Sequence, residues 1–257
     1  MVTNPIRAVL FDMGGTLENL TYDETLRQEA TRDLRGFLQE LELDPGLSAA
    51  DLRAALFSGM EAYQAWRAQS EVELPPERVW TEYIFASRGL CRERLLAAAD
   101  ELAFFYETHY YVRRLRPEAP AVLQALHRKG FRLAIISNTL SRRLVPTKLA
   151  DYGIAHYFDP VLTSASLGWR KPNARIFEEA TRRMQLPAQA CAYVGDTVSR
   201  DVIGARRAGY GLVFQIRSFL TGKSDSGTEG VAPDATIQDL SQLLDLVGSP
   251  VETVHDH

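Results

Sequence analysis

Cysteine, excess positive charge and long apolar runs are all scarce in this sequence. Cys91 and Cys191 are its only cysteines and no Cys-x-x-Cys spacing occurs, so we expect two buried thiols in a reducing compartment. No apolar stretch approaches the roughly 18 residues of a membrane span. The net charge of −4 argues against nucleic acid as a partner. A strand-like run begins at residue 6, which leaves no room for a signal peptide, so a soluble cytoplasmic protein is expected.

The stretch IRAVLFDMGGTL at residues 6–17 joins an apolar run to a sharp turn. Ala8–Phe11 predicts a buried strand, Asp12 stands where that strand ends, and Gly14-Gly15 turn the chain. Ligands of open α/β sheets bind at the carboxyl ends of strands. A carboxylate there could attack an electrophile or hold a cation. Taken alone, the motif more often marks a strand-ending aspartate in a turn, so its meaning depends on the rest of the chain.

Residues 21–112 are rich in Leu, Ala, Glu and Arg, with apolar residues at helical spacing. The clearest series are Leu34, Phe37, Leu38 and Leu41, and then Leu52, Leu56, Met60 and Tyr63. Breaks at 44–46, 74–76 and 88–89 divide the block into about four helices. No strand-like alternation interrupts them. We therefore predict that residues 18–112 form an all-helical inserted domain, joined by short linkers near Glu18 and Arg113.

Strands and helices alternate after Pro117. Helices are predicted over about 118–129, 141–152, 174–184, 199–208 and 239–247, and strands over about 131–136, 158–163, 190–194 and 211–216. This alternation indicates an α/β fold with a doubly wound parallel sheet, in which the strand at 8–11 takes part. The core domain then comprises residues 1–17 and 113–257. The Gly- and Ser-rich segment 221–230 is predicted to be a mobile loop.

Polar residues stand at or beside the ends of these predicted strands. They are Ser137 to Thr139, Lys171, Asp196 and Asp201. Because parallel strands end at one edge of a sheet, these groups can converge on Asp12. The carboxylates of Asp12 and Asp196 suit a hard cation such as Mg²⁺. A hydroxyl beside backbone N–H groups suits phosphate oxygens, and a lysine offsets developing negative charge.

Four motifs, in order, resemble those of the haloacid dehalogenase (HAD) superfamily of aspartate-nucleophile hydrolases. FDMGGTL resembles the first motif and IISN the second, GWRKPNARIF resembles the lysine motif, and VGDTVSRD resembles the acidic fourth motif. The match covers the core, residues 6–17 and 113–248. The resemblance implies a Rossmann-like core, and the helical insertion stands where the family places its helical C1 cap.

The resemblance also implies a metal site and a nucleophile. Asp12 would be the nucleophile and a magnesium ligand. The carbonyl of Gly14 and the carboxylate of Asp196 would be further ligands. Asp201 would act on the metal through water or from behind the direct ligands.

A phosphate-binding set follows from the same resemblance. Ser137, Asn138 and Lys171 would bind the transferring phosphoryl group, and Lys171 would also neutralise Asp12. Thr16 would orient the loop on which the phosphate lies. The implied cofactor is Mg²⁺ and the implied partner is a small phosphorylated substrate.

One position departs from the family's phosphatases, which carry a second aspartate two residues after the nucleophile as general acid and base. Here that position is Gly14. Such a group typically contributes about 10²–10⁴-fold, so weak turnover is expected, and a sugar-phosphate mutase is disfavoured. Phosphonate-cleaving members use a cap lysine, whereas this chain has no lysine before Lys129. Dehalogenases need no leaving-group acid, but they generally lack the acidic fourth motif.

The function that the sequence favours is a magnesium-dependent hydrolase of a small phosphorylated molecule, acting through an aspartyl-phosphate on Asp12. A metal-binding pseudoenzyme or binding module stays open, and a dehalogenase-like hydrolase ranks below both. Glu18 is a candidate substitute proton donor, although a hinge or surface role is favoured for it. Arg27, Arg32 and Arg35 are predicted to lie on solvated helix faces. Neither the substrate nor the oligomeric state follows from the sequence.

Overall fold

The computed structural model describes residues 5–86, 89–219, 221 and 230–248. Within these ranges six strands form one sheet in the order β5-β4-β1-β6-β7-β8, and every neighbouring pair is parallel. The strands are β1 (Ala8–Phe11), β4 (Arg132–Ser137), β5 (Phe158–Thr163), β6 (Cys191–Gly195), β7 (Leu212–Ile216) and β8 (Ala235–Ile237). The predicted α/β fold is confirmed. The central place of β1 puts its end between the ends of β4 and β6.

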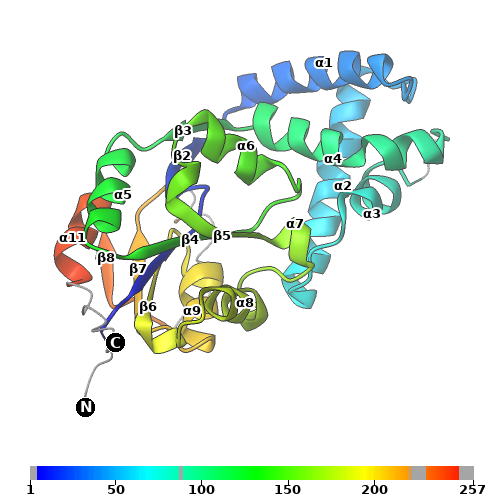
Figure 1. Cartoon of the computed structure of the whole chain (residues 1–257). Coiled ribbons are helices and arrows are strands. Elements are labelled where there is room, and N and C mark those ends of the chain that lie inside the picture. Colours follow the sequence, from blue (N-terminus) through cyan, green and yellow to red (C-terminus); the bar gives the residue numbers. More distant parts are fainter. Residues whose placement is uncertain (1–4, 87–88, 220, 222–229, 249–257) are drawn as a thin grey trace.

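Helices cover both faces of the sheet (Figure 1). Side chains of β1 alternate between the two layers, with Val9 and Phe11 in one apolar cluster and Ala8 and Leu10 in the other. The first cluster packs against α5 (Ala119–Arg128), α6 (Leu144–Asp151) and α11 (Leu243–Leu246), and the second against α8 (Ala174–Met184) and α9 (Ile203–Arg207). Burial on both faces explains why the strands read as continuous apolar runs.

Some predicted elements of the core differ in detail. The helix expected over 199–208 begins as a π-helical turn, Val198–Val202, before α9, and the one over 239–247 begins as a 3₁₀ turn, Leu240–Gln242, before α11. The short helix α7 (Ser164–Leu167) and strand β8 were not predicted, because three or four residues are too few to show a period. The predicted loop 221–230 lies mostly outside the described residues.

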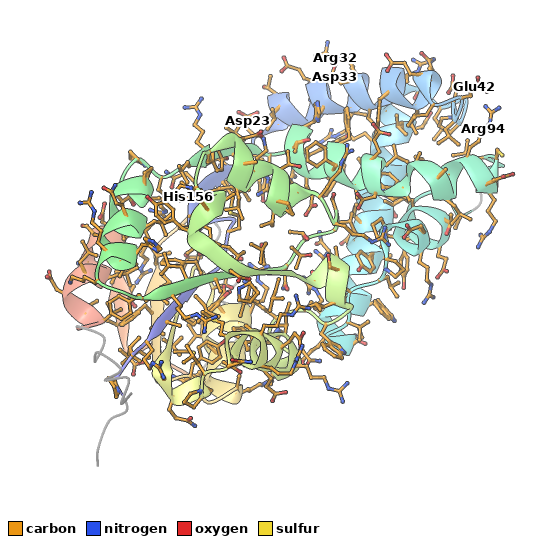
Figure 2. The ribbon with its side chains drawn as sticks, viewed as in Figure 1. Asp23, Arg32, Asp33, Glu42, Arg94 and His156 are labelled. Atoms are coloured by element: carbon orange, nitrogen blue, oxygen red, sulfur yellow. The ribbon has the colours of Figure 1, made fainter. Side chains whose placement is uncertain are left out.

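The helical insertion (residues 24–109) forms a layer beside the sheet (Figure 1). It contains α1 (Glu24–Glu40), α2 (Ala49–Ser70), α3 (Pro76–Arg78) with the π-helical turn Val79–Ile84, and α4 (Arg92–His109). Both predicted apolar series pack in its own core. Asp23 caps α1 by accepting a hydrogen bond from the backbone N–H of Leu26 at 2.8 Å. Arg32 and Asp33 project outward from α1 (Figure 2). Glu42 forms an ion pair with Arg94 at the end of the insertion that is farthest from the sheet (Figure 2).

The connections to the insertion are strands rather than the predicted linkers. β2 (Glu18–Thr21) and β3 (Val112–Leu115) pair antiparallel, from Glu18 opposite Leu115 to Thr21 opposite Val112. The expectation of an uninterrupted helical block over 18–112 is therefore wrong at both ends. Strands of four residues inside a long helical pattern leave no readable alternation. The division into domains of 1–17 with 113–257 and of 18–112 stays a prediction.

One contact between the insertion and the core is made by the segment between α2 and α3. Val72 forms an antiparallel bridge with Trp169. Glu73, which is buried, accepts hydrogen bonds from Ser164 Oγ at 2.9 Å and from Arg170 Nε at 3.0 Å. These contacts join the insertion to α7 and to the loop that follows it.

Two expectations from composition can be compared with the structure. Cys191 is buried as predicted, but Cys91 is exposed, because it lies just before α4 at the surface of the insertion. None of the helices in the described ranges has the length and apolarity that crossing a membrane would require.

Candidate active site

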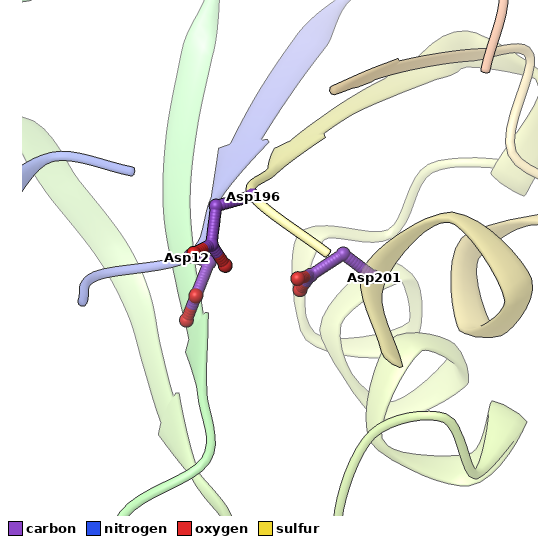
Figure 3. A group of neighbouring side chains, drawn as sticks. All are labelled: Asp12, Asp196 and Asp201. Carbon is purple, nitrogen blue, oxygen red and sulfur yellow. The ribbon is translucent and has the colours of Figure 1, made fainter. Parts of the chain in front are cut away.

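Three aspartates meet where the central strands end (Figure 3). Asp12 follows β1, Asp196 follows β6, and Asp201 lies in the π-helical turn before α9. One carboxylate oxygen from each lies within 4.8 Å of the others, and all three residues are buried. The backbone N–H of Asp12 donates to the carbonyl of Val194 at 2.9 Å, which extends the β1–β6 pairing to the site. The convergence expected from strand ends is present.

The turn after Asp12 has room for a side chain at one glycine and not at the other. Gly15 has a φ of +89°, and a Cβ there would lie 2.2 Å from Oδ2 of Asp196. Glycine at this position therefore permits the close approach of the turn to Asp196. Gly14 has no positive φ, and a Cβ there would lie 3.5 Å from Arg113 Nη1 and 3.8 Å from Leu20 Cδ1. These are ordinary van der Waals distances.

Lys171 links two of the aspartates. Its Nζ lies 2.8 Å from Asp12 Oδ1 and 2.7 Å from Asp201 Oδ1, and it donates to Tyr193 OH at 2.9 Å. Tyr193 itself contacts Asp201 Oδ1 at 3.1 Å. Sequence reasoning missed Tyr193, because an aromatic residue in a buried strand is read as core. The ammonium is buried and so requires these acidic partners.

Asn138 holds the loop that carries Lys171. Its Nδ2 donates to the carbonyl of Lys171 at 3.0 Å, and its Oδ1 accepts from the backbone N–H of Lys171 at 2.9 Å. The side-chain amide of Asn138 therefore positions the lysine loop. Ser137, at the end of β4, lines the pocket beside Asp12.

Asp196 is the carboxylate with the least support from protein donors. Burial, together with the nearby charges of Asp201 and Asp12, raises its pKa to about 7. Ser218 donates to Oδ2 at 2.6 Å, whereas Oδ1 is buried with no hydrogen-bond partner among the described residues. A buried carboxylate oxygen without a donor fits a cation ligand. Ser218 was missed, although its place two residues after β7 is the same strand-end signal.

Asp201 has the opposite environment. Burial raises its pKa, but the charges of Lys171 and Arg200 and the hydrogen bonds to Lys171 and Thr197 outweigh burial and hold the pKa below its usual value. Its Oδ2 accepts from both the backbone N–H and the hydroxyl of Thr197, at 3.1 and 2.6 Å. Asp201 is therefore ionised and already surrounded by donors.

A cavity of about 650 Å³ opens above these groups, between the core and the helical insertion. Six of the residues that the sequence placed at this site line it, and these are Asp12, Gly14, Ser137, Asn138, Thr139 and Lys171. Asp196 and Asp201 do not line it, although their carboxylates lie within 4.8 Å of that of Asp12. Thr16 is fully buried, does not line the cavity, and its hydroxyl has no hydrogen-bond partner among the described residues.

Glu18 is buried and does not line the cavity, so the surface role expected for it is wrong. It begins β2, in one of the two connections to the insertion, and a hinge role stays a prediction. Its carboxylate is fully buried between Arg113 Nη1 at 2.7 Å and the hydroxyl of Tyr152 at 2.9 Å. Both oxygens are thus engaged in joining β2 to β3 and α6. Glu18 does not fit the role of a substitute proton donor.

Glu107, from α4, lines the cavity and was not predicted. Its carboxylate accepts hydrogen bonds from the backbone N–H groups of Leu140 at 3.0 Å and Ser141 at 2.9 Å, in the loop after β4. Burial raises its pKa to about 7, although Arg113 and these two hydrogen bonds oppose the shift. No local pattern marks such a residue, because its partners lie more than thirty positions away.

Glu107 should give the protein a pH-dependent stability. Its pKa is raised from 4.5 to about 7 on folding, so the folded state binds the proton more tightly. Stability is then lost as the pH rises from about 5 to about 7, by at most about 3 kcal/mol. In urea unfolding, the stability of Glu107→Gln should lack this loss with rising pH. The free energy of unfolding of the variant should therefore increase relative to that of the wild type as the pH rises. Glu101→Gln, exposed on the same helix, is the control. If the difference in stability between Glu107→Gln and the wild type does not change with pH across this range, the expectation is contradicted.

Comparison with known proteins places the chain in a family. The family model for haloacid dehalogenase-like hydrolases matches residues 6–209. A glyceraldehyde 3-phosphate phosphatase of Methanopyrus kandleri is 30% identical over 242 residues, which cover 94% of this chain and 97% of the relative. A phosphoserine phosphatase of Thermus thermophilus is 34% identical over 201 residues, or 77% of this chain and 74% of the relative. A solved 2-haloacid dehalogenase from Pseudomonas syringae pv. Tomato DC3000 has a TM-score of 0.65 at 22% identity, covering 94% of this chain and 98% of that one.

The fold is of the α/β class, and the family model and the relatives make the chain a hydrolase. This chain belongs to the haloacid dehalogenase-like hydrolase family, as the family model and the full-length relative show. The predicted resemblance is confirmed. The likeness to the dehalogenase structure, at 22% identity, shows the shared fold alone.

Proposed function

We propose that this chain is a magnesium-dependent phosphatase that cleaves small phosphate esters by attack of Asp12 on phosphorus. The observation that carries the proposal is the buried, partnerless Oδ1 of Asp196 within the same cluster as Asp12 and Asp201. It supports a cation site directly beside a candidate nucleophile. The phosphatase relatives from two organisms support the same reaction class.

The residues present fit a magnesium ion. Asp12 and Asp196 would hold it together with the backbone carbonyl of Gly14, and waters would complete the shell. Asp201, whose oxygens accept from Lys171 and Thr197, would stand behind these ligands. When bound, the metal offsets the charge of the phosphoryl oxygens and of the carboxylates.

The chain's own groups would bind and orient the phosphoryl group. Ser137 lines the cavity, and Nζ of Lys171 lies 2.8 Å from Oδ1 of Asp12. Attack by an Asp12 oxygen forms an oxygen–phosphorus bond and breaks the bond to the leaving oxygen. Charge stabilisation by Lys171 needs no proton transfer, so it remains effective without an acid at position 14.

Protonation of the leaving oxygen should be the slow step, because position 14 supplies no acid. With Gly14 in place of a carboxylic acid, aryl and acyl phosphates should react faster than alkyl phosphates, because their oxygens leave without a proton. The water that releases phosphate from Asp12 likewise lacks a base at position 14. The phosphorylated form of Asp12 should therefore accumulate.

The test is phosphate release from p-nitrophenyl phosphate, acetyl phosphate and a panel of alkyl phosphates, with magnesium and after chelation. We expect release that requires magnesium and favours the first two substrates. No metal-dependent release from any of them would contradict the proposal and favour a binding module. Chloride release from 2-chloropropionate without added metal would favour a dehalogenase instead.

Restoring a carboxylate at position 14 should raise activity. The backbone at Gly14 accepts a side chain, and its Cβ would point toward Arg113. Gly14→Asp is expected to increase kcat/KM for alkyl phosphates by about 10²-fold. This is the lower end of the range for general acid catalysis, because the charge of Arg113 favours the ionised carboxylate over the acid that donates the proton. The matched control is Gly14→Asn, which fills the space without a titrating group. Equal gains with Asp and Asn, or equal gains for aryl and alkyl substrates, would count against this role.

A further inference from the structure

The cavity above Asp12 is rich in arginine. Five arginines line it, and four of them have acceptors within the protein. Arg67 and Arg170 form ion pairs with Glu73, Arg113 forms one with Glu18, and Arg200 donates a hydrogen bond to Thr197. The fifth is Arg27. Arg27 forms no ion pair within the described residues. It also departs from the prediction of a solvated helix face, whereas Arg32 and Arg35 on the same helix are exposed.

The surroundings of Arg27 orient its guanidinium without satisfying it. The guanidinium carbon lies 3.8 Å from the ring centroid of Tyr22 and 5.1 Å from that of Phe57. Nε is buried and has no hydrogen-bond partner among the described residues. Aromatic faces attract a cation but offer no acceptor in the plane of the guanidinium. A half-buried guanidinium with free donors at a cavity wall therefore lacks an acceptor that a ligand would supply.

The two ends of the cavity differ in what they can bind. Asp12, Lys171 and Ser137 belong to the core and face the reacting phosphate in the proposed function. Arg27 belongs to α1 in the helical insertion and lines the same cavity. The planar fork of an arginine matches a carboxylate or a phosphate through two parallel hydrogen bonds. A substrate held at both ends thus needs two anionic groups.

We infer that the substrate is a small phosphate ester with a second anionic group, and that Arg27 binds this group. The inference rests on the proposed function for the reacting phosphate. It narrows the substrate class to phosphorylated acids and bisphosphates and disfavours uncharged phosphorylated alcohols. It also assigns to α1 a specificity-determining residue that the helical periodicity could not reveal.

The experiment compares three two-carbon phosphate esters as competitive inhibitors of p-nitrophenyl phosphate hydrolysis. They are phosphoglycolate, ethylene glycol bisphosphate and ethyl phosphate, which carry a carboxylate, a second phosphate and no second charge. For the wild type, the inhibition constant of phosphoglycolate or of ethylene glycol bisphosphate should be about 10- to 100-fold lower than that of ethyl phosphate. Whichever of the two binds more tightly identifies the anion.

Variants assign the preference to Arg27. Arg27→Met keeps the length of the side chain and should reduce the ratio of inhibition constants to near one, whereas Arg27→Lys should keep a part of it. Arg32→Met, on the exposed face of α1, should leave the ratio unchanged. Because each ratio is measured on one folded sample, a loss of stability in a variant cancels.

The outcomes separate the two proposals. If the wild type does not hydrolyse p-nitrophenyl phosphate with magnesium, the proposed function fails. If it does, and the charged and uncharged esters bind equally, the inference about the second anion fails alone. A preference that survives in Arg27→Met would also overturn it.

Discussion

Asp12→Asn is expected to abolish phosphate release, with kcat lowered by about 10⁴- to 10⁶-fold. The amide has the shape of the carboxylate but does not attack phosphorus, and it removes one charge from the cluster that would hold the metal. Folding should be preserved, because Lys171 keeps Asp201 as an acidic partner at 2.7 Å. Kinetics with p-nitrophenyl phosphate and a thermal melt measure both effects.

The control for this variant is Asp151→Asn, an exposed carboxylate at the end of α6. It should keep wild-type turnover. Mass spectrometry after acid quenching should find a phosphorylated peptide containing Asp12 in the wild type and none in Asp12→Asn. Turnover by Asp12→Asn within tenfold of the wild type would rule out Asp12 as nucleophile.

Gly15→Ala is expected to damage both the fold and the metal site. The residue has a φ of +89°, and its added Cβ would lie 2.2 Å from Oδ2 of Asp196. Strain at a positive φ and overpacking each cost about 1–3 kcal/mol, so the free energy of unfolding should fall by about 2–6 kcal/mol. Asp196 is also held by Ser218 at 2.6 Å, so moving its carboxylate breaks that contact.

The matched control is Gly14→Ala, one position earlier in the same turn. Its Cβ would meet Arg113 and Leu20 at ordinary contact distances, so its stability should stay close to that of the wild type. Urea unfolding gives the stability, and the magnesium concentration for half-maximal activity should rise in Gly15→Ala alone. Equal behaviour of the two variants would show that the turn does not depend on Gly15.

The order of apolar runs predicts most of the core, because the central strands of the parallel sheet are buried on both faces and most strands after Pro117 are separated by helices. The same logic predicts the strand-end groups Asp12, Ser137 and Asp196, since one edge of a parallel sheet collects them. Lys171 and Asp201 came from the resemblance and from their place beside those ends. All of these were named from the sequence, and the structure brings them together.

The rest of the site depends on contacts between distant segments. Glu107 meets Leu140 and Ser141 across the boundary of the insertion, and no local pattern announces it. Arg27 occupies a position that helical periodicity assigns to solvent, whereas it lies over the rings of Tyr22 and Phe57 and lines the cavity. For Glu18 the sequence favours a hinge or surface role, whereas Arg113 and Tyr152 bury its carboxylate. Tertiary packing overrides the local preference in each case.

The paired strands β2 and β3 make the insertion exchangeable. The chain leaves the core through Glu18–Thr21 and returns through Val112–Leu115, with Thr21 directly opposite Val112. Opposed residues of an antiparallel pair lie only about 5 Å apart, so a tight turn could join them with no change to the central sheet. Any segment inserted between these two positions would therefore be joined to the core at the same place, near Asp12. Such an arrangement lets new substrate preferences arise by substituting one contiguous length of chain, while the reacting groups stay where they are.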